Sequence, residues 1–285
     1  MKAHNLSCVK LASALLAGFL AFASSAQATP ISLDLLSSSA PWYSSTSQIT
    51  FSKTTEKITY SPKNENTDAL SYFASQDSPV TLDIGEKLTL SFDYTITGAV
   101  NNRNNSLRIG LFSSGDETRV SADFSDAGAN NYTGYFITTN PGLTSSSGTT
   151  LRARSESSSS VSYLMGGSNN SLHGDVLNTS AATKVTADTS YSGFLEIERI
   201  SEDAVRITYS FGGKSVVYTD SAYNYTSFDT IGVNFSKLST ADPTTLMITR
   251  LTLQVTAAIP EATTVALLGG LGSLLAVVLI RHFNR

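Results

Sequence analysis

The chain has 285 residues with 19 basic and 23 acidic side chains, a formal net charge of −4 at pH 7, and one cysteine, Cys8. Between residues 29 and 258 the counts are 15 basic and 22 acidic, a net charge of −7, and the only histidine there is His173. This composition excludes a disulfide framework and a multi-histidine metal centre, and we expect no nucleic-acid partner.

The N-terminus has the pattern of a secretory signal peptide over residues 1–28. Lys2 and Lys10 form a positive region, residues 11–22 are apolar, and the small-x-small sequence of residues 26–28 follows. Such a pattern predicts cleavage between Ala28 and Thr29. Because Cys8 precedes the cleavage site, we expect the mature protein to have no thiol.

The body, residues 29–258, is predicted to consist of β-strands. The stretch "KLTLSFDYTI", residues 87–96, alternates apolar and polar side chains with period two, which is typical of a half-buried antiparallel strand. Gly212-Gly213 predicts a hairpin turn between two of the segments. The other predicted strands are residues 107–112, 119–124, 132–138, 191–200, 204–211, 215–218, 228–235 and 246–255.

Two polar segments interrupt this pattern. Residues 144–189 contain a serine run and a Gly/Ser/Asn cluster, so a long, partly mobile loop region is predicted there, held to the body at points such as Leu151, Leu164 and Met165. Residues 30–79 are polar with apolar residues at intervals. We expect them to wrap the body and to add one or two edge strands.

The chain closes with residues 259–285, "IPEATTVALLGGLGSLLAVVLIRHFNR". Residues 262–280 carry no charge and are long enough for a transmembrane helix, and Arg281 and Arg285 form a positive flank that favours the cytoplasmic side. A buried core helix is the alternative, but such a helix normally has a polar face. The order of signal peptide, exported body, Pro260-Glu261, apolar helix and basic tail resembles the bacterial PEP-CTERM proteins, although Ala262 stands where the family has a second proline.

This resemblance implies that an exosortase-like membrane transpeptidase is a partner and cuts near Pro260-Glu261. The body would then pass from a transient stay in the inner membrane to the cell surface or extracellular matrix. A permanent single-span anchor is the alternative that this ending leaves open.

The predicted fold class is an all-β antiparallel β-sandwich. Over residues 80–256 the order of the segments resembles the concanavalin A-like jelly roll, through stretches such as "LTLSFDYTI", "GFLEIERISEDAVRITYSFGGKSVVYTD" and "FDTIGVNFSK". The favoured function is that of a non-enzymatic surface or matrix protein, adhesive, structural or in contact with polysaccharide.

The alternative is a secreted carbohydrate-active enzyme. Glu196 and Glu198 stand two apart, so both leave the same face of a strand, about 7 Å apart, within the range that glycoside hydrolases use. The stretch lacks the central aspartate of jelly-roll glucanases. The competing interpretation is a solvent-exposed charged face, with Leu195 and Ile197 packed inward.

Two further kinds of site are considered. No cofactor is expected, except that a structural calcium ion is compatible with the acidic positions Asp116-Glu117, Asp123 with Asp126, or Asp220. Sugar contact requires exposed aromatic rings beside Asn and Asp, and the candidates by residue type are Trp42-Tyr43, Tyr132, Tyr135, Tyr191 and Tyr223-Asn224-Tyr225.

Overall fold

The computed structural model describes residues 31–45, 50–61, 68–97, 106–123, 129, 131–139, 148–155, 164–165, 175–182, 185–236 and 245–258. The predicted signal peptide with its Ala28–Thr29 cleavage site, His173, Pro260-Glu261, the apolar run 262–280 and the two terminal arginines lie outside these ranges. Within them, no helix is long and apolar enough to cross a membrane. All the strands belong to one compact unit, Pro30–Thr256.

The first layer is an eight-stranded antiparallel sheet. Its centre is β7, which pairs with β12 on one side and with β17 on the other over most of its length. β17 in turn pairs with β4 through residues 246–248 and with β1 through residues 252–255. The order is β14 (Lys214–Asp220), β13 (Val205–Phe211), β12 (Ser190–Arg199), β7 (Lys87–Thr97), β17 (Thr245–Thr256), β4 (Ile58–Ser61) and β3 (Thr50–Lys53), with β1 (Ile31–Asp34) also on β17.

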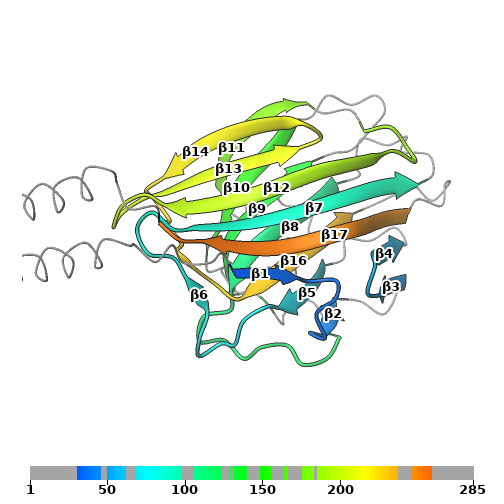
Figure 1. Ribbon diagram of the computed structural model, residues 1–285, viewed down its shortest axis with the longest axis horizontal. Coiled ribbons are helices and arrows are strands. Elements are labelled where there is room, and N and C mark those ends of the chain that lie inside the picture. The colour runs from blue at the N-terminus through cyan, green and yellow to red at the C-terminus, as the bar shows by residue number, and fades with distance from the viewer. Residues whose placement is uncertain are drawn as a thin grey trace, which may run out of the picture. The chain divides into compact units, whose positions relative to one another are not determined.

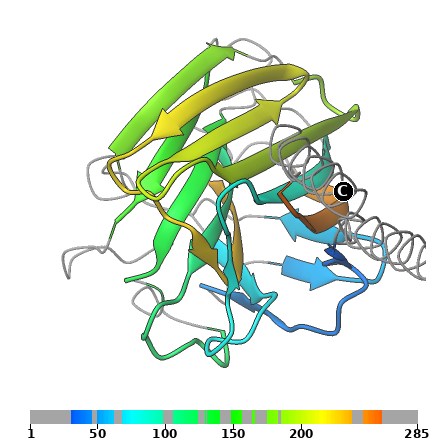
Figure 2. The same cartoon turned by 60° about the vertical axis from the view of Figure 1, so that its left-hand side comes forward.

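The second layer is a seven-stranded antiparallel sheet. Its order is β11 (Asp175–Ala182), β10 (Gly148–Arg154), β9 (Thr133–Thr139), β8 (Ser106–Ser113), β16 (Thr230–Ser236), β5 (Asp68–Tyr72) and β2 (Trp42–Ser44). A separate ribbon joins β6 (Val80–Thr81) to β15 (Ser227–Phe228). Figure 1 shows the eight-stranded sheet in front of the seven-stranded one, and Figure 2 shows the same two layers after a 60° turn.

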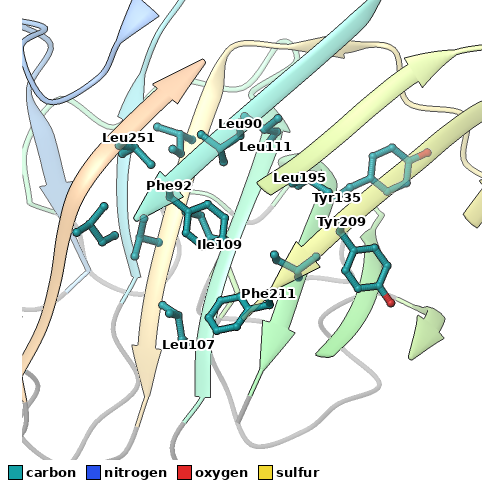
Figure 3. Packing of buried hydrophobic residues seen from close by; sticks show 14 of the residues in the cluster. Leu90, Phe92, Leu107, Ile109, Leu111, Tyr135, Leu195, Tyr209, Phe211 and Leu251 are labelled. Carbon is teal, nitrogen blue, oxygen red and sulfur yellow. The ribbon is translucent and has the colours of Figure 1, made fainter. Parts of the chain in front are cut away.

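The main core lies between the two sheets. Side chains of β7 alternate between buried and half-buried along the whole strand, and Leu90 and Phe92 enter the core. Ile109 and Tyr135 enter it from the opposite sheet, as Figure 3 shows. Burial of such an apolar layer is the main stabilising term of a sandwich.

A second apolar cluster covers the outer face of the seven-stranded sheet. Its buried members come from the sheet and from the segments above it: Leu70, Phe112, Ala129, Tyr132, Phe136, Leu164 and Met165. Buried Asp229 fixes one of these segments, because it accepts hydrogen bonds from Ser114 N (3.0 Å) and Ser114 Oγ (2.6 Å) and pairs with Arg119 at 2.9 Å. The Arg119 guanidinium also lies 4.3 Å from the centre of the Tyr72 ring.

The predicted class, an antiparallel β-sandwich of jelly-roll type, is confirmed. The strands predicted from residues 87–96, 107–112, 132–138, 191–200, 204–211, 215–218 and 246–255 are present, with ends that shift by one or two residues. The Gly212-Gly213 turn joins β13 to β14, and both glycines have positive φ, which the tight turn requires.

Four expectations are corrected. No strand forms over residues 119–123, because Arg119 turns to Asp229 and Val120 N donates to the Tyr72 hydroxyl at 2.9 Å. The predicted strand 228–235 is two strands, β15 and β16, separated at Asp229. Residues 30–79 supply β1 to β5, and β4 and β5 have a partner on each side, so they are interior strands. The predicted loop 144–189 contains β10 and β11.

Candidate glycan-contacting site

The loop of residues 221–226, between β14 and β15, is shaped by one carboxylate. Asp220 ends β14 and is fully buried. Its Oδ1 accepts hydrogen bonds from the backbone N–H of Ala222 (3.0 Å) and of Tyr223 (3.4 Å), and its Oδ2 accepts one from Asn224 N (3.4 Å). An aspartate that caps the following backbone N–H groups is a common way to fix a turn. Asn224 has φ 47°, a conformation that asparagine tolerates better than most residues.

Tyr135 links this loop to the core of the sandwich. It is fully buried on β9, and its hydroxyl donates to Asp220 Oδ2 at 2.5 Å. The Tyr135 hydroxyl oxygen in turn accepts a hydrogen bond from Tyr225 N at 3.0 Å. Burial, together with the neighbouring Asp220, raises the pKa of Tyr135 far above its ordinary value, so the hydroxyl remains a donor. Its ring centre lies 5.3 Å from that of Tyr225, and the Tyr225 and Tyr223 ring centres are 5.7 Å apart. We call Tyr135, Tyr223 and Tyr225 the tyrosine cluster.

The outer end of the tyrosine cluster is Tyr223, which is half-buried. Its hydroxyl donates to Oδ2 of Asp175, an exposed residue at the start of β11. The hydrogen bond to Asp175, with a smaller effect of burial, raises the pKa of Tyr223 to about 12. Beside it, Asn224 donates from Nδ2 to the carbonyl oxygen of Glu202 at 2.8 Å. The site thus combines a partly exposed ring with the carboxylate of an exposed residue, groups of the kind that fix the orientation of a polar ligand.

The structure places the other predicted aromatic residues differently. Tyr132 is fully buried and its hydroxyl lies 2.7 Å from that of Tyr72, so neither it nor Tyr135 can stack on a ligand. Trp42 and Tyr43 are half-buried on β2. Tyr191 stacks on Tyr94, with ring centres 5.7 Å apart and an interplanar angle of 25°.

Asp175 was not singled out from the sequence. It follows a polar stretch in which a loop was predicted, and nothing in that stretch indicates that β11 carries it to Tyr223. Asp220 was singled out for calcium. Its oxygens instead accept hydrogen bonds from the loop and from Tyr135.

The Glu196–Glu198 pair lies on the outer face of the eight-stranded sheet, and Leu195 and Ile197 are buried between the sheets. Lys87 Nζ bridges the two carboxylates at 3.4 Å and 3.2 Å, and Arg206 binds Glu198 at 2.5 Å. Burial acts to raise the pKa of Glu198, but the hydrogen bonds from Arg206 and Lys87 outweigh it and lower the pKa below the ordinary value. A glycosidase needs one carboxylic acid with a raised pKa, which this arrangement opposes.

Two of the acidic side chains considered for calcium, Glu117 and Asp123, accept hydrogen bonds from other parts of the protein. Asp116 is exposed, Glu117 Oε1 accepts a hydrogen bond from Asn131 Nδ2 at 2.6 Å, and Asp123 Oδ1 accepts one from Ser44 N at 2.9 Å. Asp126 lies outside the described residues. In the part of the chain that the structure describes, no three acidic, histidine or cysteine side chains are grouped so that they could hold a metal ion.

No protein-family model matches the chain, and no curated protein matches it either. Among solved structures, the metal-free carbohydrate recognition domain of Emp46p is 11% identical, with a TM-score of 0.47 over 74% of this chain and 87% of that one. The exoplasmic/lumenal domain of VIP36 bound to Ca²⁺ and Man3GlcNAc is 12% identical, with a TM-score of 0.45 over 77% and 86%. The carbohydrate recognition domain of Emp47p is 12% identical, with a TM-score of 0.45 over 80% and 95%. These likenesses are too distant to carry a binding site or a ligand over to this chain.

Proposed function

We propose that the protein is an exported, non-enzymatic surface or extracellular-matrix protein whose β-sandwich contacts glycans at the tyrosine cluster. The observation that carries the proposal is the half-buried Tyr223 ring beside the exposed carboxylate of Asp175. A sugar presents one apolar face and a rim of hydroxyl groups. The ring of Tyr223 suits that face, and the carboxylate accepts hydrogen bonds from the hydroxyls.

The site is preorganised for this contact. The ring of Tyr225 packs against that of Tyr223 and is itself held by buried Tyr135. Asp220 fixes the backbone of the loop through Ala222 and Asn224. Little conformational freedom of the loop is therefore lost when a ligand binds, which favours affinity from a small contact.

Export and surface sorting are supported by the sequence. The signal peptide ending at Ala28, and Pro260-Glu261 before an apolar run with Arg281 and Arg285 behind it, make up the order of a PEP-CTERM protein. We propose that an exosortase-like transpeptidase is the processing partner, with a transient inner-membrane stage. Replacing both Pro260 and Glu261 with alanine should leave the apolar run able to insert, so the variant should accumulate uncut in the inner membrane of a host that has an exosortase. If the wild type also keeps Arg285 and stays there, the permanent anchor is correct.

Glycan contact is tested by screening the protein on a glycan array and titrating the best binder. Tyr223→Ala should lose at least about tenfold in affinity, since the stacking surface is removed, while Tyr223→Phe should lose less because the ring is kept. Tyr43→Ala, a change of a half-buried tyrosine on the opposite edge of the seven-stranded sheet, is the matched control. Equal affinity in Tyr223→Ala and Tyr43→Ala would show that the tyrosine cluster is not the site.

A further inference from the structure

β14 forms an open edge of the eight-stranded sheet. It pairs with β13 on one side, and no other described strand pairs with its second side, so it ends the sheet in Figure 1. The pairing with β13 is regular over all seven residues, Lys214–Asp220. A regular exposed edge presents a row of unpaired N–H and C=O groups, which is a template for another strand.

The other sheet edges in the described part of the chain are less suited to such pairing. β1, β2 and β3 have only three or four residues each. β11 has eight residues, but its register with β10 shifts twice. Short edge strands and bulges are devices that keep an edge from pairing with another chain. β14 has neither device, and the side chain of Val217 at its centre is 56% exposed.

The hairpin turn determines which backbone groups of β14 point outward. Gly212-Gly213 has positive φ at both residues (64° and 89°), as in a type I′ turn, whose flanking residues, here Phe211 and Lys214, form a hydrogen-bonded pair. Hydrogen-bonded and non-hydrogen-bonded pairs alternate along antiparallel strands, so the even-numbered residues of β14 bond to β13. The residues whose N–H and C=O groups point to the open edge are Ser215, Val217 and Thr219.

These outward groups fit a second β14 strand that runs antiparallel. When Val217 lies opposite Val217 of a second copy, Ser215 lies opposite Thr219, and all three outward residues form hydrogen-bonded pairs. A shift by two residues in either direction loses one of these pairs, and a shift by one residue sets the outer face of one strand beside the inner face of the other. The best register therefore has a two-fold axis at Val217, the symmetry of a closed dimer.

The side chains favour the same register. On the outer face, the exposed Val217 side chains of the two copies meet on the axis, with Ser215 and Thr219 paired on either side. On the inner face, Val216 lies opposite Tyr218, and both are half-buried residues packed against the main core. Pairs of a β-branched and an aromatic side chain stabilise adjacent strands, so the dimer would extend the core across the axis.

The charges at the two ends of β14 favour the antiparallel direction. Exposed Lys214 begins the strand, and Asp220 at its end lies opposite Val205, next to the turn that carries exposed Glu202 and Asp203. Antiparallel pairing brings Lys214 of each copy towards these carboxylates of the other copy. Parallel pairing would place like charges together.

We propose that β14 pairs with β14 of a second copy of this chain, so that two eight-stranded sheets join into one across a two-fold axis at Val217. The dimer would also link two tyrosine clusters, a consequence that rests on the proposed contact with glycans. Each cluster follows Asp220, three residues beyond the axis, so the two strand ends lie about 20 Å apart along the strand direction. Two sites at a fixed spacing bind a polymer more tightly than one site does.

A cysteine at the axis tests this pairing directly. With Cys8→Ser as background, Val217→Cys supplies the only thiol of the chain. The Cα atoms of a hydrogen-bonded antiparallel pair are about 5.5 Å apart, which a disulfide can span, so mild oxidation of the full-length protein in detergent should give a covalent dimer. Ile84→Cys is the control, since Ile84 is a similarly exposed apolar residue (49%) outside β14. Equal cross-linking of the two variants, or none in Val217→Cys, overturns the proposal.

Sedimentation of the full-length protein over a range of concentrations measures the dimer without a cross-link. Val217→Lys should weaken dimerisation at least about tenfold, because it sets two like charges opposite each other, and Val217→Thr should keep the dimer because threonine is also β-branched. Val217 is exposed, so neither change should unfold the protein. Ile84→Lys adds the same charge elsewhere and should leave the dimer intact. A monomeric wild type, or a dimer that Val217→Lys leaves unchanged, contradicts the assignment to β14.

Glycan binding distinguishes failure of the dimer from failure of the tyrosine cluster. On a surface densely coated with the best binder from the glycan array, the wild type should bind at least about tenfold more tightly than Val217→Lys, and both should bind the free glycan equally. Equal binding on the dense surface would show that the dimer does not present two sites together. If Tyr223→Ala binds the free glycan as the wild type does, the tyrosine cluster is not the site, and the cross-link at Val217 still decides whether the dimer forms.

Discussion

Removing the carboxylate of Asp220 tests how the tyrosine cluster is held. In Asp220→Ala, the buried Tyr135 hydroxyl loses its 2.5 Å acceptor, and Ala222 N loses its 3.0 Å acceptor. Hydrogen bonds to a charged group contribute about 1.5–3 kcal/mol, and a buried donor left unpaired costs about 1–3 kcal/mol, so we expect a loss of about 2–4 kcal/mol in the free energy of unfolding.

The assay is thermal unfolding of the purified protein. For a body of this size, 1 kcal/mol corresponds to about 2–4 °C, so the Tm should fall by roughly 5–15 °C. Asp203→Ala is the control, because it removes an exposed carboxylate in the nearby β12–β13 turn and should change stability by less than about 0.5 kcal/mol. If Asp220→Ala unfolds at the same temperature as Asp203→Ala, Asp220 does not hold the loop and the argument for a preorganised site is wrong.

Three further results are expected. The folded pKa of Glu198 lies below its unfolded value near 4.5, so its stabilising effect is present above that pH and is lost as the pH falls through the folded pKa. The free energy of unfolding, measured in urea, should therefore differ less between pH 7 and pH 3 in Glu198→Gln than in the exposed control Glu202→Gln. Gly110→Ala should destabilise the protein by about 1–3 kcal/mol in thermal unfolding, because the new Cβ would lie 2.5 Å from Phe136 Cβ, and a normal Tm would show that the two strands can separate there. Exported protein should not react with maleimide, and labelling would mean that Cys8 is retained.

The strands that could be predicted are those whose side chains alternate between apolar and polar, because one face of the strand enters the core and the other faces outward. β7 alternates along its whole length, since it is central and half of its side chains enter the core. β12 and β13 show the same alternation: Leu195 and Ile207 are buried, and Glu198 and Arg206 form an ion pair on the outer face. Period two in the sequence is enough to place such strands.

The strands that were not predicted are short and polar, and they form because strands from distant parts of the chain pair with them. β5 becomes a strand because β16 and β2 pair with it from both sides, and β10 because β9 and β11 do so. At Asp229 the error is the reverse, because a continuous strand was predicted where the chain is interrupted. Its neighbours look like strand residues, but the hydrogen bonds from Ser114, far away in the sequence, bend the chain between β15 and β16.

The candidate site was predictable only by residue type. The sequence indicates Tyr223-Asn224-Tyr225 as a possible sugar contact, but it gives equal weight to Tyr132 and Tyr135, which the fold buries. The exposure of each tyrosine ring, and the approach of Asp175 to Tyr223, depend on how β9, β11 and β14 pack against one another. No pattern in the local sequence predicts that packing. The same holds for Glu196 and Glu198, whose spacing was correct for a pair but whose partners, Lys87 and Arg206, come from the neighbouring strands.

Glycan contact at the tyrosine cluster is tested most directly by NMR, with the chemical shifts of the protein mapped while the best binder from the glycan array is titrated in. The largest changes should fall on Tyr223, Asn224 and Tyr225 and on Asp175 across from them. Changes centred on Glu196 and Glu198, on the open face of the eight-stranded sheet, would contradict it and would support the carbohydrate-active enzyme instead.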